Sequence, residues 1–377
     1  MEVCILGNQT KNELLRQDIL ANLQWLSPEQ ILSQLDEVIV FGTGGAGERV
    51  AQVLTQYQVN ILCYVDNDPS RQQQLFHGKP VISPDQLQNS THLVLIASLW
   101  ARDIAQQLLQ LECKYLDFSF CVDFSRWKDH FNCEIFDATK AVEMGQKYLA
   151  GEDLYSFLGC IRYRQTYDPL QLSTPCHEHY MSNTVAPCSD DIYIDGGAWQ
   201  GDTLLELKTL CGDAIEVHSF EPDDDNRKIL TDLIVKQSIP HCYVIKKALW
   251  DQEAILEFVT STEAVHTMQS RVSTDVSTHE QVTEVSATTI DCYAKMLPRK
   301  PTYIKLDIEG AEPQALKGAA MLMREAPPKL AISAYHEPNH LWQLIEQIAN
   351  SNSDYHFWFV HHSQHLFESV IYAKADK

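Results

Sequence analysis

Ile192-Tyr193-Ile194-Asp195-Gly196-Gly197-Ala198-Trp199-Gln200-Gly201-Asp202-Thr203 is the stretch that decides the fold of this 377-residue chain. A short apolar β-rich run ends at an acidic residue, and a glycine-rich segment follows it. This order predicts a buried strand, a turn and the start of a helix, which is the unit of a parallel α/β sheet. Ligands of such sheets gather at the carboxyl ends of the strands, so we expect Asp195 to lie at a binding site.

Further apolar runs of β character follow this strand, and helical segments separate most of them. They lie at residues 217–220, 243–245, 303–306, 330–333, 356–360 and 369–373. The last two are joined by a short polar segment and predict an antiparallel hairpin. We therefore expect residues 191–377 to form a mostly parallel seven-stranded sheet that ends in this hairpin. The stretch at residues 260–289 is mostly polar and does not predict any secondary structure.

A second glycine loop, at residues 42–47, follows a strand at 38–41 and precedes a helix at 48–57. Its glycines Gly42, Gly44 and Gly47 fit the G-x-G-x-x-G pattern of dinucleotide-binding turns. Asp66 ends the next strand, where an acidic group binds ribose hydroxyls in such sites. The pattern predicts a Rossmann-like domain with a nucleotide or nucleotide-sugar site, and a scaffold without a ligand remains the alternative.

The segment between the two α/β parts is predicted to be mainly helical, with residues 138–149 as its clearest helix and an irregular stretch at 167–191. The expected organisation is an α/β protein with two Rossmann-like domains. We divide the chain into a Rossmann-like domain at 1–122, a helical connector at 123–190 and a second α/β domain at 191–377.

Charge and composition narrow the classes of partner. The chain has 29 Lys and Arg against 51 Asp and Glu, a formal net charge of −22. Such a surface repels nucleic acid and anionic membranes, so we expect neither as a partner. No apolar run reaches the length of a membrane helix or a signal peptide, which predicts a cytoplasmic protein. Small molecules or neutral polymers are the expected ligands, and a homo-oligomer remains open.

Two acidic residues at strand ends indicate the cofactor. Asp195 before its glycines suits a ligand with a cationic amine and a sulfonium, whereas it would repel a pyrophosphate. Glu221 follows the next strand in Phe220-Glu221-Pro222, where its carboxylate can accept both ribose hydroxyls. Together they predict S-adenosylmethionine.

At this point the sequence resembles the FkbM family of S-adenosylmethionine-dependent methyltransferases. The motifs of that family are D-x-G-A-x-x-G-D-T, F-E-P and K-x-D-x-E-G-x-E, and this chain has them at residues 195–203, 220–222 and 305–312. The resemblance extends from about residue 191 to the C-terminus and implies a class I methyltransferase fold. Gly196 departs from the family pattern, which more often has Ile, Val or Cys there.

The resemblance also implies cofactor-binding residues. Asp195, Gly197 and Gly201 would shape the methionine end of the site, Glu221 would hold the ribose, and adenine would lie near Ala248. Asp202 is either a further cofactor residue or only a favourable acidic group in the first turn of a helix.

Candidate catalytic residues follow two later strands. Asp307 and Glu309 lie where the acceptor should meet the methyl group, and either could act as a base. Glu312 is a further carboxylate or only a solvated acid in the first helical turn. His336 is our preferred general base, because a neutral imidazole can accept a proton near pH 7.

A metal site is the rival hypothesis for the same residues. It would use Asp307, Glu309 and His336 with either His361 or His362 as the fourth ligand. By contrast, we interpret His179 as one member of a surface pair.

We therefore predict an O-methyltransferase that acts on a hydroxyl group of a saccharide or secondary metabolite. Two alternatives remain. One is a nucleotide-sugar or dinucleotide enzyme that uses the first glycine loop, and the other is a non-catalytic carbohydrate-assembly module.

Overall fold

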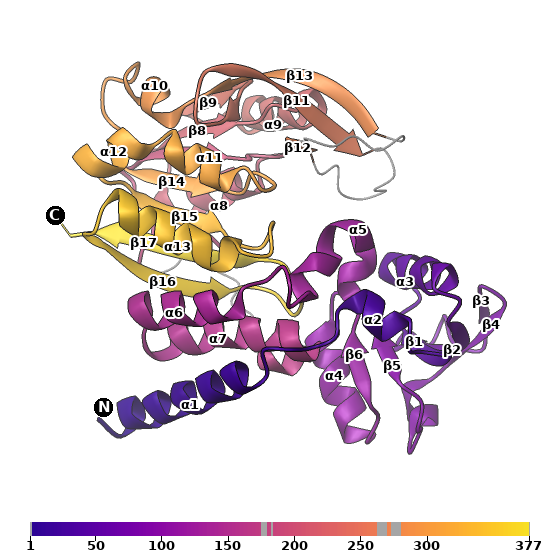
Figure 1. The fold of residues 1–377 in the computed structure, drawn as a ribbon. Coiled ribbons are helices and arrows are strands. Elements are labelled where there is room, and N and C mark those ends of the chain that lie inside the picture. Colours follow the sequence, from indigo (N-terminus) through magenta and orange to yellow (C-terminus); the bar gives the residue numbers. More distant parts are fainter. Residues whose placement is uncertain (1, 175–178, 182–183, 262–269, 273–279, 377) are drawn as a thin grey trace. The chain divides into compact units, whose positions relative to one another are not determined.

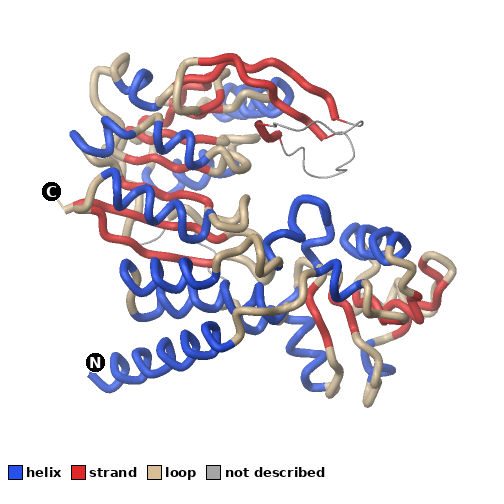
Figure 2. Tube along the Cα trace, viewed as in Figure 1, coloured by secondary structure: helices blue, strands red, loops and turns tan. Residues whose placement is uncertain are grey.

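The computed structural model describes residues 2–174, 179–181, 184–261, 270–272 and 280–376. The chain forms two compact units: Met1–His177 with Phe359–Ser369, and Glu178–Trp358 with Val370–Lys377. In each unit strands pack with helices, as the red and blue segments of Figure 2 show. The protein is therefore an α/β protein with two Rossmann-like parts, as predicted, while the three-part division at residues 122 and 190 stays a prediction.

The first unit has a six-stranded sheet in the order β3-β4-β2-β1-β5-β6. Its strands are β1 (Glu37–Phe41), β2 (Asn60–Val65), β3 (Leu75–Phe76), β4 (Lys79–Ile82), β5 (Val94–Ile96) and β6 (Tyr115–Asp117). Neighbouring strands are parallel except for β3 and β4. The three strands expected from apolar runs are β1, β2 and β5. The short strands β3, β4 and β6 carry too few apolar residues to be recognised by pattern.

The helices of the first unit lie before, between and after its strands. They are α1 (Glu2–Ala21), α2 (Pro28–Leu32), α3 (Gly45–Gln56), α4 (Ala101–Gln110), α5 (Phe124–Trp127), α6 (Ala138–Tyr148) and α7 (Gly151–Thr166). Polar contacts join α1 to α7: Arg162 Nε lies 2.7 Å from Asp18 Oδ2, and Gln165 Nε2 donates to Ile19 O over 3.2 Å. The helical character expected after residue 123 is confirmed by α5, α6 and α7.

The second unit is built on a seven-stranded sheet in the order β16-β17-β15-β14-β7-β8-β9. Its strands are β7 (Ile192–Gly196), β8 (Glu216–Phe220), β9 (Cys242–Ile245), β14 (Tyr303–Leu306), β15 (Lys329–Ser333), β16 (Tyr355–His361) and β17 (Ser369–Ala375). Strands β9, β8, β7, β14 and β15 are parallel, and β17 runs antiparallel to β15. The mostly parallel sheet with its C-terminal hairpin is therefore confirmed.

Helices cover both faces of this sheet, with α11–α13 on the near face in Figure 1 and α8 and α9 behind it. They are α8 (Asp202–Cys211), α9 (Asp224–Gln237), α10 (Ile290–Ala294), α11 (Glu312–Lys317), α12 (Ala320–Glu325) and α13 (His340–Ser351). Strands β7 and β14 are buried along their whole length, which is typical of parallel strands between two helical layers.

A second, four-stranded sheet in this unit was not predicted. Its order is β10-β13-β11-β12, and its strands are β10 (Ala248–Leu249), β11 (Ala254–Ser261), β12 (Ser270–Val272) and β13 (Glu280–Thr288). β11 and β13 form a long antiparallel pair. Many residues of this sheet are polar, so its alternation is too weak to read from the sequence.

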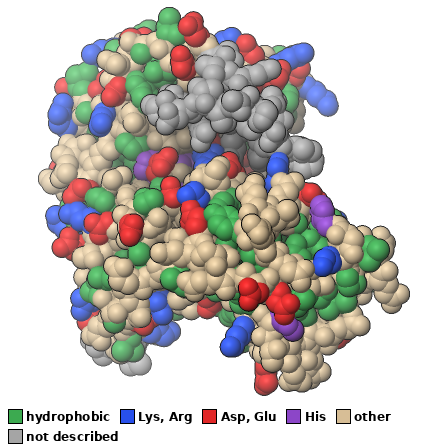
Figure 3. All heavy atoms as spheres, turned by 45° about the vertical axis from the view of Figure 1, so that its right-hand side comes forward, with side chains coloured by type: hydrophobic (Ala, Val, Ile, Leu, Met, Phe, Trp, Pro, Cys, Tyr) green, Lys and Arg blue, Asp and Glu red, His purple; other side chains and the backbone are tan. Residues whose placement is uncertain are grey.

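The charged side chains do not gather by sign on the face shown in Figure 3, where acidic and basic groups alternate across the surface. The formal net charge of the whole chain is −22. Within the residues that the structure describes, every helix is too short or too polar to cross a bilayer.

The glycine loop of the first unit depends on a close backbone approach. Gly42 has a φ of +121°, and a Cβ atom on it would lie 2.3 Å from Ala97 O. Gly45 begins α3 three residues later, has no positive φ and would find open space for a Cβ atom.

Gly42→Ala should therefore lower the free energy of unfolding of the first unit by about 2 kcal/mol or more, through strain and overpacking. Gly45→Ala is the matched control and should leave that free energy unchanged or slightly raised. Urea denaturation followed by circular dichroism measures both variants. Equal stability of the two would contradict the close approach at Gly42.

Candidate active site

A buried ion pair joins the carboxyl ends of β7 and β14. Asp195 and Lys305 lie opposite each other in the parallel register, and Lys305 Nζ is 3.2 Å from Asp195 Oδ1. Both side chains are almost completely buried. Lys305 Nζ also donates to Gly196 O over 3.2 Å and to Gly197 O over 2.8 Å. Burial lowers the pKa of Lys305, but Asp195 and Asp307 outweigh it and hold that pKa above its usual value.

The loop after β7 is shaped by glycines at two points of close packing. Gly197 has a φ of +75°, and a Cβ atom there would lie 1.9 Å from Asp307 O. Gly201 has a φ of +95° and precedes α8 as its N-cap. Gly197 therefore places the loop directly against the end of β14, whereas Gly201 packs it against Leu230 and Leu233 of α9. The unusual Gly196 is explained by packing, because Leu306 and Leu249 side chains fill the space that its side chain would take.

Glu221, at the end of β8, is held by the same loop. Its Oε2 accepts a hydrogen bond from the Trp199 amide over 2.8 Å, and its Oε1 accepts one from the Asp223 amide over 2.9 Å. Trp199 has a φ of +45°, which is unusual for a bulky residue and indicates that this contact is enforced by its surroundings. Burial raises the pKa of Glu221 to about 7, although the two amides favour the charged form. Each oxygen keeps acceptor capacity for a ligand.

Two further predicted cofactor residues lie on the elements next to this loop. Asp202 is exposed and is the first residue of α8, where its charge interacts favourably with the helix dipole. Ala248 is buried at the start of β10, after β9. Their contact with the cofactor stays a prediction.

Asp307 follows β14 and faces several partners. Its side chain is 26% exposed, and its Oδ1 accepts a hydrogen bond from Tyr335 Oη over 3.2 Å. Burial raises the pKa of Asp307, but Lys305, His336 and His179 outweigh it and hold that pKa below its usual value. His179 stacks on Tyr180 with ring centroids 3.9 Å apart and acts electrostatically on Asp307. The other member of its predicted surface pair, His177, lies outside the described residues, so that pair stays a prediction.

His336, after β15, lies among three carboxylates. Its Nδ1 is 2.9 Å from Glu312 Oε1, and its Nε2 is 3.4 Å from Asp307 Oδ1 and 3.6 Å from Glu309 Oε2. Burial lowers the pKa of His336, but Glu312 and Glu309 outweigh it and raise that pKa to about 9. The ring is therefore charged at neutral pH in this state, whereas a general base must be neutral, and the base role of His336 stays a prediction.

Glu312 is not the solvated acid that one interpretation of the sequence allowed. It is the first residue of α11 and is completely buried. Its Oε1 accepts a hydrogen bond from the Ile308 amide over 2.9 Å, and its Oε2 lies 3.4 Å from His340 Nδ1. Burial raises the pKa of Glu312, but His336 and His340 outweigh it and lower that pKa strongly.

The predicted metal ligands are brought together only in part. Among the described residues, Asp307, Glu312 and His336 form the group of potential ligands, and it includes neither His361 nor His362. His361 Nδ1 instead lies 2.9 Å from Ser369 Oγ.

Sequence reasoning missed the roles of Lys305, Tyr335 and His179. Lys305 is the first residue of a quoted motif and Tyr335 precedes His336, so their position at strand ends was the available signal. No local pattern marks His179.

The glycine loop of the first unit uses its acidic residue internally. Asp66 Oδ2 accepts hydrogen bonds from both the amide and the hydroxyl group of Thr43, and Arg71 Nη1 lies 3.7 Å from the same oxygen. A Cβ atom on Gly47 would lie 2.2 Å from Gly42 O, whereas one on Gly44 would meet only Arg71, at 3.8 Å. A nucleotide site at this loop stays a prediction.

Comparisons with known families agree with this geometry. The methyltransferase FkbM domain matches residues 195–362, which contain the Asp195, Glu221 and Asp307–Glu312 segments. The C2185-like N-terminal domain matches residues 34–115, around the first glycine loop. No curated protein matches the sequence significantly.

Solved structures are similar to both units. A methyltransferase FkbM from Methylobacillus flagellatus KT aligns over 98% of this chain and 100% of its own, with 19% identity and a TM-score of 0.72, which establishes the fold. Fibrillarin from Aeropyrum pernix, crystallised with natively bound S-adenosyl-L-methionine, covers 49% of this chain and 66% of its own, with 10% identity and a TM-score of 0.32, too low to support an argument. Residues 195–362 match the methyltransferase FkbM domain, and the protein is an S-adenosylmethionine-dependent methyltransferase with a Rossmann-like N-terminal part.

Proposed function

We propose that the protein transfers a methyl group to a hydroxyl oxygen of a saccharide or another small hydroxylated metabolite. S-adenosylmethionine supplies the electrophilic methyl group when it is bound. The observation that carries the proposal is the Glu221 carboxylate, which is buried at a strand end with each oxygen anchored by a backbone amide. Such a carboxylate is pre-oriented to accept the two hydroxyl groups of a ribose.

The second support for the cofactor site is the Asp195 carboxylate. It is completely buried, and its Oδ2 has no hydrogen-bond partner among the described residues. Its charge is already paired with Lys305, so Asp195 supports the site by shaping the loop rather than by presenting a free charge to a ligand. Asp195 acts from beneath the loop, by holding Lys305 and through it the carbonyl groups of Gly196 and Gly197.

The acceptor side favours a neutral hydroxyl compound. Asp307 and Glu309 side chains are 26% and 24% exposed, so an acceptor can reach both. Carboxylates bind hydroxyl groups as hydrogen-bond acceptors and repel an anionic acceptor. Asp307, which stays ionised, can also take the proton that the hydroxyl group loses as its oxygen attacks the methyl carbon.

Titration of the full-length protein with S-adenosylhomocysteine tests the cofactor part. We expect saturable heat and a rise in melting temperature, both strongly reduced in Glu221→Ala, which removes the ribose contact. The acceptor part is tested by transfer of a labelled methyl group to a panel of saccharides, with detection of methoxy products by mass spectrometry. Absence of any response to millimolar ligand would contradict the assignment.

Cofactor affinity should depend on pH through Glu221. Its pKa in the free protein is raised to about 7, so below that pH the group is protonated and loses acceptor capacity. Binding then requires proton release and tightens as pH rises, by about tenfold from about pH 6 to about pH 8. Calorimetry on Glu221→Gln, which cannot titrate, should show weak binding without this component of the pH dependence. An unchanged profile in Glu221→Gln would assign the titration to another group.

Asp195→Asn should act mainly on stability. It leaves the Lys305 ammonium group buried without its closest counter-ion, so the free energy of unfolding of the second unit should fall by about 3 kcal/mol. Asp202→Asn, at the exposed first position of α8, is the control and should change that free energy by less than about 0.5 kcal/mol. Urea denaturation measures both, and similar effects would show that the ion pair contributes little.

A further inference from the structure

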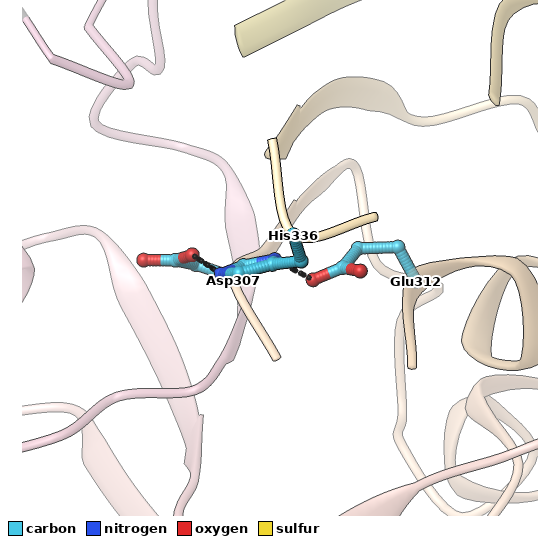
Figure 4. Close-up of side chains that lie close together, drawn as sticks. All are labelled: Asp307, Glu312 and His336. Atoms are coloured by element: carbon cyan, nitrogen blue, oxygen red, sulfur yellow. Dashed lines mark hydrogen bonds and ion pairs between the residues drawn. The ribbon is translucent and has the colours of Figure 1, made fainter. Parts of the chain in front are cut away.

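The His336 imidazole has one nitrogen that is hydrogen-bonded and one that is not. Nδ1 contacts Glu312 Oε1 at 2.9 Å. Nε2 is buried, has no hydrogen bond among the described residues, and is directed toward Asp307 Oδ1 at 3.4 Å and Glu309 Oε2 at 3.6 Å. Figure 4 shows the ring between Asp307 and Glu312, with one carboxylate on each side. These three residues form the compact group of potential metal ligands among the described residues, but Glu312 contacts Nδ1 rather than Nε2.

This arrangement is the one that protein metal sites use to orient a histidine ligand. A metal-binding histidine generally donates its other ring N–H to a carboxylate, which fixes the tautomer and directs the free lone pair at the metal. Glu312 is completely buried and is itself held by the Ile308 amide and by His340. When a cation displaces the proton on Nε2, the proton on Nδ1 stays on the Glu312 side, and the lone pair of Nε2 faces Asp307 and Glu309.

The charges around His336 and the solvent exposure of its neighbours also favour a cation site. Three carboxylates surround one imidazole, and the nearby cation, Lys305, is already paired with Asp195. The His336 side chain is 1% exposed, whereas those of Asp307 and Glu309 are about a quarter exposed. An ion bound between His336 Nε2 and the carboxylates of Asp307 and Glu309 would have its remaining coordination positions open toward solvent.

We propose that Asp307, Glu309 and His336 Nε2 bind a divalent cation, with Glu312 as the positioning residue for His336. One imidazole and two carboxylates suit a cation such as Mn²⁺. Its role in catalysis rests on the proposed function, whereas its binding does not. The open positions would hold two adjacent hydroxyl groups of the acceptor and lower the pKa of one.

Each bond and proton of the methyl transfer can be followed. The bound hydroxyl group loses its proton to Asp307 or to water, and its oxygen forms a bond to the methyl carbon. The bond between that carbon and sulfur breaks, and its electron pair stays on sulfur to give S-adenosylhomocysteine.

Mn²⁺ binding to the chelator-treated, full-length protein tests the site. The electron paramagnetic resonance signal of free Mn²⁺ falls as the ion binds, and we expect a single site per chain. Asp307→Asn, which is close in shape to the original residue and lies at a partly exposed position, should abolish Mn²⁺ binding at this site. Glu312→Gln should weaken it by about tenfold or more, because His336 loses its orienting carboxylate. Circular dichroism verifies that each variant is folded.

Glu337→Gln is the matched control, because Glu337 is an exposed carboxylate directly after His336 and is outside the proposed ligand set. It should bind Mn²⁺ like the unmodified protein. No bound Mn²⁺, or equal binding by the Asp307→Asn and Glu337→Gln variants, would overturn the metal site. S-adenosylhomocysteine titration of the same samples separates the two proposals. If the unmodified protein binds S-adenosylhomocysteine but not Mn²⁺, only the cation site is rejected. If it does not bind S-adenosylhomocysteine, the proposed function is rejected.

Discussion

The buried ion pair between Lys305 and Asp195 is the interaction on which the active site depends. Burying two charges is unfavourable unless both are well paired, and Lys305 meets this condition with one carboxylate and two backbone carbonyl groups. Those carbonyl groups belong to Gly196 and Gly197, so the ammonium group of β14 fixes the conformation of the loop after β7. A hydrophobic pair at these positions could join the strands but could not hold the loop.

The geometry of the loop follows from this contact. With its carbonyl group on Lys305, Gly197 lies so close to Asp307 O that only a residue without a side chain fits. The segment that would bind the cofactor and the carboxylate that would meet the acceptor therefore share one backbone contact. For an in-line methyl transfer this matters, because the distance between donor and acceptor is set by two rigid strand ends rather than by mobile side chains.

The sheet of the second unit could be predicted because its central strands are continuous apolar runs. The candidate site could be predicted only as residues at strand ends. His336 and Glu312 are 24 positions apart, and their contact depends on a turn in which Glu309 adopts a φ of +58°. No sequence pattern specifies that conformation for a glutamate. For the same reason the buried state of Glu312 and the approach of His179 to Asp307 became visible only in three dimensions.

The two glycine loops show why similar motifs lead to different chemistry. Asp66 and Glu221 hold equivalent places, each after the second strand of its sheet. Asp66 Oδ2 takes up the amide and hydroxyl groups of Thr43 and faces Arg71, so its acceptor capacity is largely used within the loop. Within the part of the chain that the structure describes, Glu221 accepts hydrogen bonds from two backbone amides, which orient it and leave it further acceptor capacity. A carboxylate that is held in place and still has hydrogen-bond acceptor capacity is suited to bind a ligand. In the second unit, Glu221 is such a carboxylate.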